Sequence, residues 1–227
     1  MNYLAIGLII IIVIIVYYTY YYLTNNSLTS GLQDLSKQIV VSYDKLINPN
    51  AMTYSYQCWL YISSSTVSSP IFYRKSSDGS THNEFEVDLS GQILELKAGT
   101  GSTAPIKIMT ITNNFPIQKW TYLVVNVKNL KTFEAYINGK LAKTINIDST
   151  STITPTFKTS ALHIGNNGIT GYVTKFIRQD KILDAKTIWE TYLSGNGLTS
   201  YFNSFIPYGL NMSISKGEEL QRVVNIF

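Results

Sequence analysis

The clearest strand pattern in the chain is Tyr54-Ser55-Tyr56-Gln57-Cys58-Trp59-Leu60-Tyr61-Ile62, a run of aromatic and aliphatic residues. Successive side chains of a β-strand point to opposite faces. The even positions therefore share one face: Tyr54, Tyr56, Cys58, Leu60 and Ile62. We expect this face to line a hydrophobic core, with the Cys58 thiol acting as a small buried hydrophobe.

Similar short runs, rich in β-branched and aromatic residues, follow at intervals of roughly ten residues, as in an all-β sandwich. The predicted strands lie near 54–62, 70–75, 84–89, 92–97, 106–112, 120–127, 132–138, 140–147, 161–165 and 171–179. Tight hairpin turns are expected at Leu89-Ser90-Gly91-Gln92 and at Ile137-Asn138-Gly139-Lys140. The apolar spacing in 184–193 predicts one helix, opened by Asp184 as N-cap. The fold class is all-β: an antiparallel sandwich with one short helix after its last strand.

The overall composition excludes several classes of protein. Charged residues make up 14 % of the 227 positions, too few for long solvated helices, coiled coils or disordered tails. The formal net charge of +4 is small and dispersed, so no nucleic-acid partner is expected. The single cysteine excludes an internal disulfide and a cysteine-based zinc site.

Residues 3–23 contain no charged side chain. At about 1.5 Å of rise per residue, a helix of this length crosses a hydrocarbon core of about 30 Å. We expect a single-pass membrane anchor, with these positions facing lipid or the headgroups: Tyr3, Leu4, Ile10, Ile14, Tyr17, Tyr18 and Leu23. A cleaved signal peptide is the alternative, but no Lys or Arg precedes the apolar run and no small-residue cleavage site follows it.

The expected organisation has four parts. Residues 1–23 form the anchor, 24–47 a spacer with a first strand near 38–43, 48–197 the sandwich, and 198–227 an apolar tail. Within the tail, 210–215 is expected to form a strand that pairs near the first strand. So much apolar surface rarely stays exposed, so the tail is expected to dock on the sandwich or on a partner through Phe205, Tyr208, Ile226 and Phe227.

Four stretches, in this order along the chain, resemble the laminin-G-like jelly roll of the concanavalin A-like lectin/glucanase superfamily. They are Tyr56-Gln57-Cys58-Trp59-Leu60, Trp120-Thr121-Tyr122-Leu123-Val124-Val125, the hairpin Phe133-Glu134-Ala135-Tyr136-Ile137-Asn138-Gly139-Lys140-Leu141, and the segment from Gly171 to Trp189. The resemblance implies a jelly-roll β-sandwich. The combination of a Tyr-rich anchor, a jelly roll and an apolar tail also resembles membrane-anchored virion proteins of nucleocytoplasmic large DNA viruses.

The carboxylates give no support for an enzyme. Glycoside hydrolysis needs two carboxylates, which the glucanase branch carries on one strand as Glu-x-Asp-x-Glu or Glu-x-Asp-x-x-Glu. Here Glu86-Val87-Asp88 is followed by Ser90 and Gly91 where the second Glu should fall. Glu84, Glu86 and Asp88 share one strand face, which we expect to be a solvated outer face. His82 and His163 have no Ser or Cys partner at a recognisable spacing, so no catalytic residue is assigned.

Binding functions remain open. The resemblance implies that a calcium site can occur on the loops of the fold. Because the candidate ligands Asp78, Asp148 and Asp180 stand on separate loops, no set of metal ligands and no cofactor are assigned. A glycan or protein partner could contact a rim made of Tyr73, Asn113, Asn114, Asn166 and Asn167, although Asn is equally expected as a turn former.

Three functions follow, in order of preference. The first is a membrane-anchored structural protein, a minor capsid component of a virion that links the inner membrane to the capsid shell. Its partners are the lipid bilayer and other structural proteins. The second is a membrane-tethered lectin that binds glycans, and the third is a divergent glycoside hydrolase.

Overall fold

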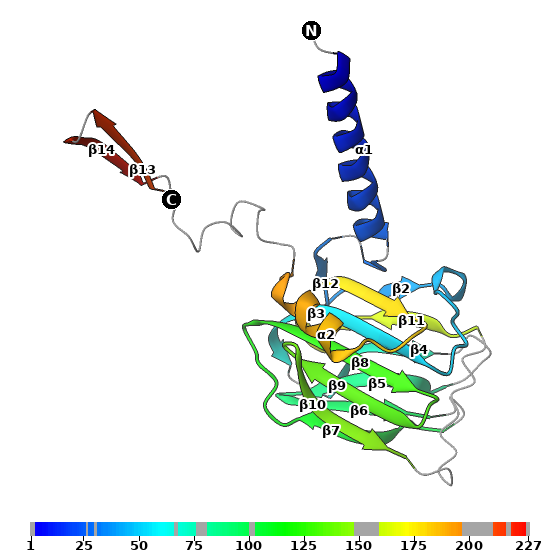
Figure 1. Ribbon diagram of the computed structural model, residues 1–227. Helices are drawn as coiled ribbons and strands as arrows, with labels where there is room; N and C mark the ends of the chain where they lie inside the picture. Colours follow the sequence, from blue (N-terminus) through cyan, green and yellow to red (C-terminus); the bar gives the residue numbers. More distant parts are fainter. Residues whose placement is uncertain are drawn as a thin grey trace. The chain divides into compact units, whose positions relative to one another are not determined.

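Two six-stranded antiparallel sheets stack face to face in a jelly-roll-like sandwich (Figure 1). The computed structural model describes residues 3–25, 27–29, 31–65, 68–75, 81–99, 103–147, 159–196, 211–216 and 219–225; side chains at 3–6, 20–25 and 211–225 lie outside the description. The first sheet has the order β1 (Gln33–Asp34), β12 (Ile169–Gln179), β3 (Tyr54–Ser65), β8 (Trp120–Lys128), β9 (Thr132–Ile137) and β10 (Lys140–Asn146). The second has the order β2 (Ile39–Val41), β11 (Ala161–Ile164), β4 (Ser69–Lys75), β5 (Asn83–Ser90), β6 (Ile93–Ala98) and β7 (Ile106–Thr112).

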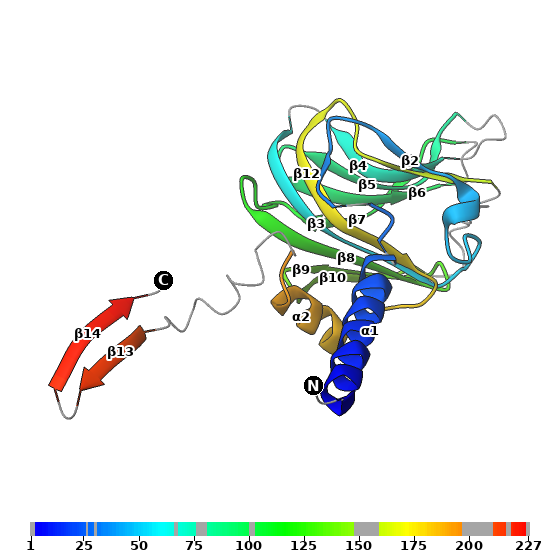
Figure 2. The ribbon, with the colours of Figure 1, turned by 90° about the horizontal axis from the view of Figure 1, so that it is seen from above.

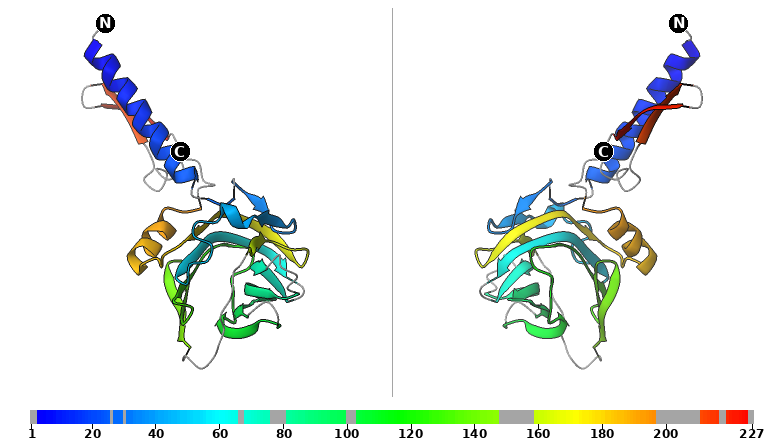
Figure 3. Two further views of the ribbon diagram at one scale, coloured as in Figure 1. Left: turned by 90° about the vertical axis from the view of Figure 1, so that its right-hand side faces the viewer. Right: turned by 90° about the vertical axis from the view of Figure 1, so that its left-hand side faces the viewer.

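The main core lies between the two sheets, and the face predicted from β3 lines it. Tyr54, Tyr56, Cys58, Leu60 and Ile62 are all at most 1 % exposed and belong to one hydrophobic cluster with the inward residues of the second sheet. This confirms the predicted core face. Both sheets curve as they pass over the core (Figure 3).

A second, smaller cluster covers the outer face of the first sheet. Helix α2 (Ala185–Leu193) places Ile188 on Trp59, Tyr122, Val124 and Tyr136, and Figure 2 shows α2 on the side away from the second sheet. The helix begins as predicted, because the Thr187 backbone N–H donates to the Asp184 carboxylate at 3.0 Å. The first sheet is therefore apolar on both faces where α2 packs.

The turn between β9 and β10 is the predicted two-residue Asn-Gly turn. Lys140 pairs with Ile137, and Asn138 and Gly139 have φ angles of 51° and 78°. A Cβ on Gly139 would lie 2.6 Å from Cε3 of Trp189, so the turn packs closely under α2.

Two buried arginines close one end of the sandwich. Arg74 of β4 donates to the carbonyls of Pro49 and Ser160, at 2.7 and 2.9 Å, and Arg178 of β12 donates to those of Ile47 and Asn48. A short 3-10 helix, η1 (Tyr43–Lys45), precedes this loop. The two opposed sheets thus hold the same loop, at 47–49, through charge-assisted hydrogen bonds.

Helix α1 (Tyr3–Asn25) spans most of the expected anchor, and its side chains from Leu8 to Tyr18 are about half exposed or more. Ile10, Ile14, Tyr17 and Tyr18 are among them; the side chains of Tyr3, Leu4 and Leu23 lie outside the description. Within the described part of the chain, no helix has both the length and the apolarity needed to cross a membrane. The sandwich begins soon after this helix, since the Leu28 N–H donates to the Phe176 carbonyl at 2.7 Å.

The C-terminal part forms a separate unit, 194–227, with one two-stranded sheet. The predicted strand near 210–215 is present as β13 (Asn211–Lys216), and it pairs with β14 (Glu219–Asn225). A short connection brings two adjacent strands of this kind together more readily than a distant partner. Phe205, Tyr208, Ile226 and Phe227 lie outside the described residues.

Candidate ligand-binding site

The outer face of the second sheet carries a row of polar side chains that crosses five strands. Cross-strand pairing runs from His163 on β11 to Tyr73 on β4, Glu86 on β5, Lys97 on β6 and Lys107 on β7. Directly opposed side chains of a sheet lie within contact distance. The register therefore brings together residues that stand far apart in the sequence.

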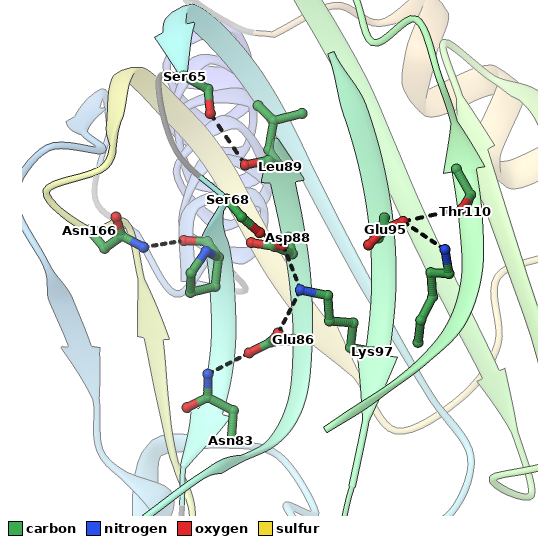
Figure 4. Close-up of polar contacts among 12 residues, drawn as sticks. Ser65, Ser68, Asn83, Glu86, Asp88, Leu89, Glu95, Lys97, Thr110 and Asn166 are labelled. Carbon is green, nitrogen blue, oxygen red and sulfur yellow. Dashed lines mark hydrogen bonds and ion pairs between the residues drawn. The ribbon is translucent and has the colours of Figure 1, made fainter. Parts of the chain in front are cut away.

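Lys97 forms ion pairs with two of the three carboxylates of β5, Glu86 and Asp88 (Figure 4). Its Nζ lies 2.6 Å from Asp88 Oδ2 and 3.3 Å from Glu86 Oε1. Asp88 also accepts from the Ser68 hydroxyl at 2.5 Å, and Glu86 accepts from the Asn83 amide at 2.6 Å. Burial alone lowers the pKa of Lys97, but the hydrogen bond to Asp88 and the charges of Asp88 and Glu86 outweigh it and raise that pKa.

The expected solvated outer face of β5 is wrong. Glu84, Glu86 and Asp88 are 0 %, 7 % and 3 % exposed. The reason is that β5 lies inside the sheet between β4 and β6, whose longer side chains stand on either side of it. Glu84 is held by the Ser160 hydroxyl at 2.6 Å, so all three carboxylates have hydrogen-bond partners.

A hollow of about 380 Å³ opens beside this row, lined by Gln38, Asn166 and Asn167. Asn166, in the loop between β11 and β12, donates to the Pro70 carbonyl at 2.9 Å and accepts from the Gly168 N–H at 2.6 Å. Its amide is therefore fixed. Asn167 is exposed at the surface of the same loop.

Tyr73 lies next to the hollow. The Gln38 amide donates to its hydroxyl at 2.6 Å, and its ring stacks on His163 with centroids 4.7 Å apart and planes 3° from parallel. Burial raises the pKa of Tyr73, the Gln38 hydrogen bond lowers it, and the Glu86 charge raises it further, so the net direction is upward. Burial, followed by the Lys75 charge, lowers the pKa of His163.

The structure brings together only part of the predicted rim. Asn166 and Asn167 line the hollow, and Tyr73 lies beside it, bonded to the lining residue Gln38. Asn113 and Asn114 are exposed in the connection after β7, at the same end of the sheet. Four strand spacings, about 19 Å, separate β7 from β11, so these two residues belong to a different surface.

Lys97 of this row was not identified from the sequence, nor were Gln38, Ser68 and Asn83, whose side chains donate hydrogen bonds to Tyr73, Asp88 and Glu86. The sequence pattern that could have indicated Lys97 is the alternation of Glu95 and Lys97 opposite Glu86 and Asp88 in a predicted hairpin.

Among the described residues, no three His, Cys, Asp or Glu side chains cluster as a metal site. Asp78 and Asp148 lie outside the described residues, and Asp180 is exposed in the bend after β12.

The comparisons with known proteins agree on the fold. The family model of the concanavalin A-like lectin/glucanases superfamily, in its laminin-G form, matches residues 36–195. A search of curated proteins finds no match.

Solved structures with the same fold include receptor-binding parts of neurotoxins. The binding domain of botulinum neurotoxin DC, in complex with rat synaptotagmin II, is 18 % identical with a TM-score of 0.53 over 72 % of this chain and 42 % of that one. The ligand-binding domain of botulinum neurotoxin serotype D, in complex with N-acetylneuraminic acid, is 15 % identical with a TM-score of 0.56 over 73 % and 42 %. This chain thus spans less than half of these neighbours, which are binding domains, and the likeness shows the fold alone. The chain belongs to the concanavalin A-like lectin/glucanases superfamily.

Proposed function

We propose that the chain is a binding protein whose jelly roll recognises a glycan in the hollow beside Tyr73. The observation that carries the proposal is the set of amides that lines the hollow. Gln38 gives its N–H to Tyr73 and keeps its carbonyl oxygen for a ligand, and Asn167 presents an exposed amide. Amide groups that both donate and accept suit the hydroxyls of a sugar.

The pairing of the carboxylates supports binding over hydrolysis. A glycosidase needs one carboxyl group as acid and another, unencumbered, as nucleophile or base. Glu86 and Asp88 are both buried and both paired with Lys97, so neither faces a substrate as a free group. The structural neighbours named above are also binding domains.

The test is binding of the full-length chain, in detergent, to an immobilised glycan panel that includes neutral and sialylated oligosaccharides, with and without calcium. Glycans that bind are then titrated by calorimetry. Asn167→Ala is expected to weaken binding about fivefold, which is about 1 kcal/mol for one lost hydrogen bond. Asn114→Ala, at the same end of the sheet but outside the hollow, is the matched control and should bind as wild type. A folded protein that binds no glycan in either condition contradicts the proposal.

A second candidate function is the membrane-anchored structural role, a virion component that links membrane and capsid shell. It is supported by α1, an uninterrupted helix of 23 residues without a charged side chain, whose described apolar side chains from Leu8 to Val16 contact solvent. The proposal rests on the whole sequence of α1, of which positions 7–19 have described side chains. The virion setting rests on the resemblance in architecture.

Liposome flotation tests this second function. The full chain should float with neutral phosphatidylcholine vesicles, and Ile11→Lys should reduce flotation, because a lysine at the centre of a membrane helix costs about 3 kcal/mol. Lys143→Met, in β10, is the control. Cross-linking in purified particles would then identify capsid neighbours. Full-length protein that stays with the unbound fraction contradicts the anchor.

A further inference from the structure

Charge is unevenly distributed around the hollow. In the described part of the chain, its lining residues Gln38, Asn166 and Asn167 are uncharged. The cluster of Glu86, Asp88 and Lys97, which we call the carboxylate triad, contains two negative charges and one positive charge. The triad therefore carries one net negative charge within a largely buried setting, where solvent screens charge less than at the surface.

The carboxylate triad and the hollow lie on opposite sides of β4. Asn166 bonds to Pro70, which pairs across the sheet with Asp88. Gln38 bonds to Tyr73, which pairs with Glu86. Two strand spacings, about 10 Å, therefore separate β5 from the loop that follows β11.

Other charged side chains stand on the neighbouring segments, and one of them, Lys37, is adjacent in sequence to the lining residue Gln38. Lys37, next to Gln38, is exposed, and its charge acts on the Asp34 carboxylate, whose pKa it helps to lower after the larger effect of the Ser36 hydrogen bonds. Glu95 forms an ion pair with Lys107 at 3.2 Å. Lys75 lies at the opposite end of β4 from Pro70. The Glu86 charge also acts at Tyr73, since it contributes to the raised pKa of that phenol.

We infer that the hollow selects uncharged sugars and disfavours carboxylated ones, such as sialic or uronic acids, because the carboxylate triad repels a second negative charge beside Tyr73. This inference rests on the proposed glycan-binding function and names the ligand class of the same site. In this arrangement Gln38 and Asn167 contact the sugar, Asn166 positions the loop, and Glu86 and Asp88 act on selectivity without touching the ligand. Repulsion between unit charges about 10 Å apart, partly screened, corresponds to about threefold to tenfold in affinity.

The test compares two probes that differ by one negative charge and one methyl group: 3′-sialyllactose and its methyl ester, titrated into the full-length chain in detergent. The ester should bind about threefold to tenfold more tightly in 20 mM salt, and the difference should shrink in 300 mM salt. Equal affinities, or tighter binding of the free acid, would overturn the inference while leaving glycan binding intact. If neither probe nor any glycan of the panel binds to folded protein, the proposed function fails as well.

Variants assign the effect to the carboxylate triad. Glu86→Gln removes one negative charge at nearly constant volume. It should reduce the ratio of the affinity for the ester to the affinity for the acid at least threefold, with the affinity for the ester unchanged. Asp88→Asn should act in the same direction, and it replaces Glu86→Gln if that variant does not fold. Glu95→Gln makes the same change of charge one strand farther from the hollow and is the matched control. A ratio that changes equally in Glu95→Gln and Glu86→Gln would contradict the role of the triad.

Discussion

At the scale of single residues, the buried guanidinium groups have the largest effect on the end of the sandwich. Arg178 is 2 % exposed, lies over the Tyr54 ring at 5.3 Å and donates to the carbonyls of Ile47 and Asn48. A buried carbonyl that loses its donor costs about 1–3 kcal/mol. The packing of the 47–49 loop therefore depends on this side chain.

We predict that Arg178→Met lowers the free energy of unfolding by about 2–4 kcal/mol, because two carbonyls lose their donor and the cation–π contact is lost. Urea denaturation measures the change. Lys143→Met, in a strand whose residues are mostly exposed, should change stability by less than about 0.5 kcal/mol. If the two variants are equally stable, the guanidinium does not hold the loop.

His163 predicts a pH dependence of stability. Burial and Lys75 lower its pKa in the folded protein below the ordinary value of about 6.5. The folded state thus favours the neutral imidazole, and the contribution of His163 to the free energy of unfolding is complete above about pH 6.5. As pH falls below that value, the unfolded chain takes up a proton first, so stability falls until the folded-state pKa is passed.

His163→Gln should therefore lose less stability than wild type between pH 7.5 and pH 5. Denaturation curves at the two pH values provide the comparison, and His82→Gln, in the connection before β5, serves as the control. Parallel pH profiles for wild type and His163→Gln would refute the assignment.

At the scale of elements, tight turns fix the strand pairing. Gly139 and Gly91 both have positive φ, 78° and 60°, but a Cβ on Gly139 would meet Trp189 whereas one on Gly91 meets nothing within 4 Å. Backbone strain at positive φ costs about 1 kcal/mol for a non-glycine residue. Substitutions at the two glycines therefore distinguish the cost of backbone strain alone, at Gly91, from the cost of strain plus a steric clash, at Gly139.

Gly139→Ala should lower the free energy of unfolding by about 2–3 kcal/mol, whereas Gly91→Ala should lower it by about 1 kcal/mol. Thermal unfolding of both variants and of Gly139→Ala combined with Trp189→Ala measures the difference. The added cost should largely disappear in the Trp189→Ala background. Persistence of the full cost there would show that Trp189 is not its source.

The strand pattern was predictable because alternation and turn residues act locally. Every strand of the sandwich predicted between 54 and 179 lies within a few residues of an observed one, and α2 begins after Asp184 as expected. The short strand β1 was not predicted, because two residues carry no readable alternation. The β5–β6 turn is Gly91-Gln92, one residue later than expected, since Ser90 pairs with Ile93.

The site was less predictable, because it depends on register. Only the observed pairing places Lys97 opposite Glu86, and a turn one residue earlier would put Glu95 there. Because the sequence pattern did not place Lys97 opposite these carboxylates, it predicted that they face solvent. Gln38 reaches the hollow through pairing of β2 with β11, a contact between residues more than a hundred positions apart that no local pattern contains.

At the scale of the whole molecule, the segment before β2 is part of the sandwich. Leu35 is fully buried, its N–H donates to the Gly171 carbonyl at 2.9 Å, and the Leu28 N–H donates to Phe176. Residues 27–35 therefore contribute to stability, whereas the described side chains of α1 are exposed.

A chain that begins at residue 27 should unfold within about 2 °C of the full chain. One that begins at residue 36 should unfold about 6–12 °C lower, since about 3 kcal/mol of burial and hydrogen bonding is lost and 1 kcal/mol corresponds to about 2–4 °C at this size. Differential scanning fluorimetry measures both truncations in one buffer. Equal melting temperatures would mean that 27–35 adds nothing to the fold.

The lone cysteine gives this molecule its own reporter of opening. Cys58 is 1 % exposed between the sheets, and burial raises the pKa of its thiol, so the reactive thiolate is suppressed in the native state. A maleimide should label it only when the two sheets separate. Labelling kinetics without denaturant would then follow the opening of the sandwich, in detergent or in a vesicle, without a single substitution.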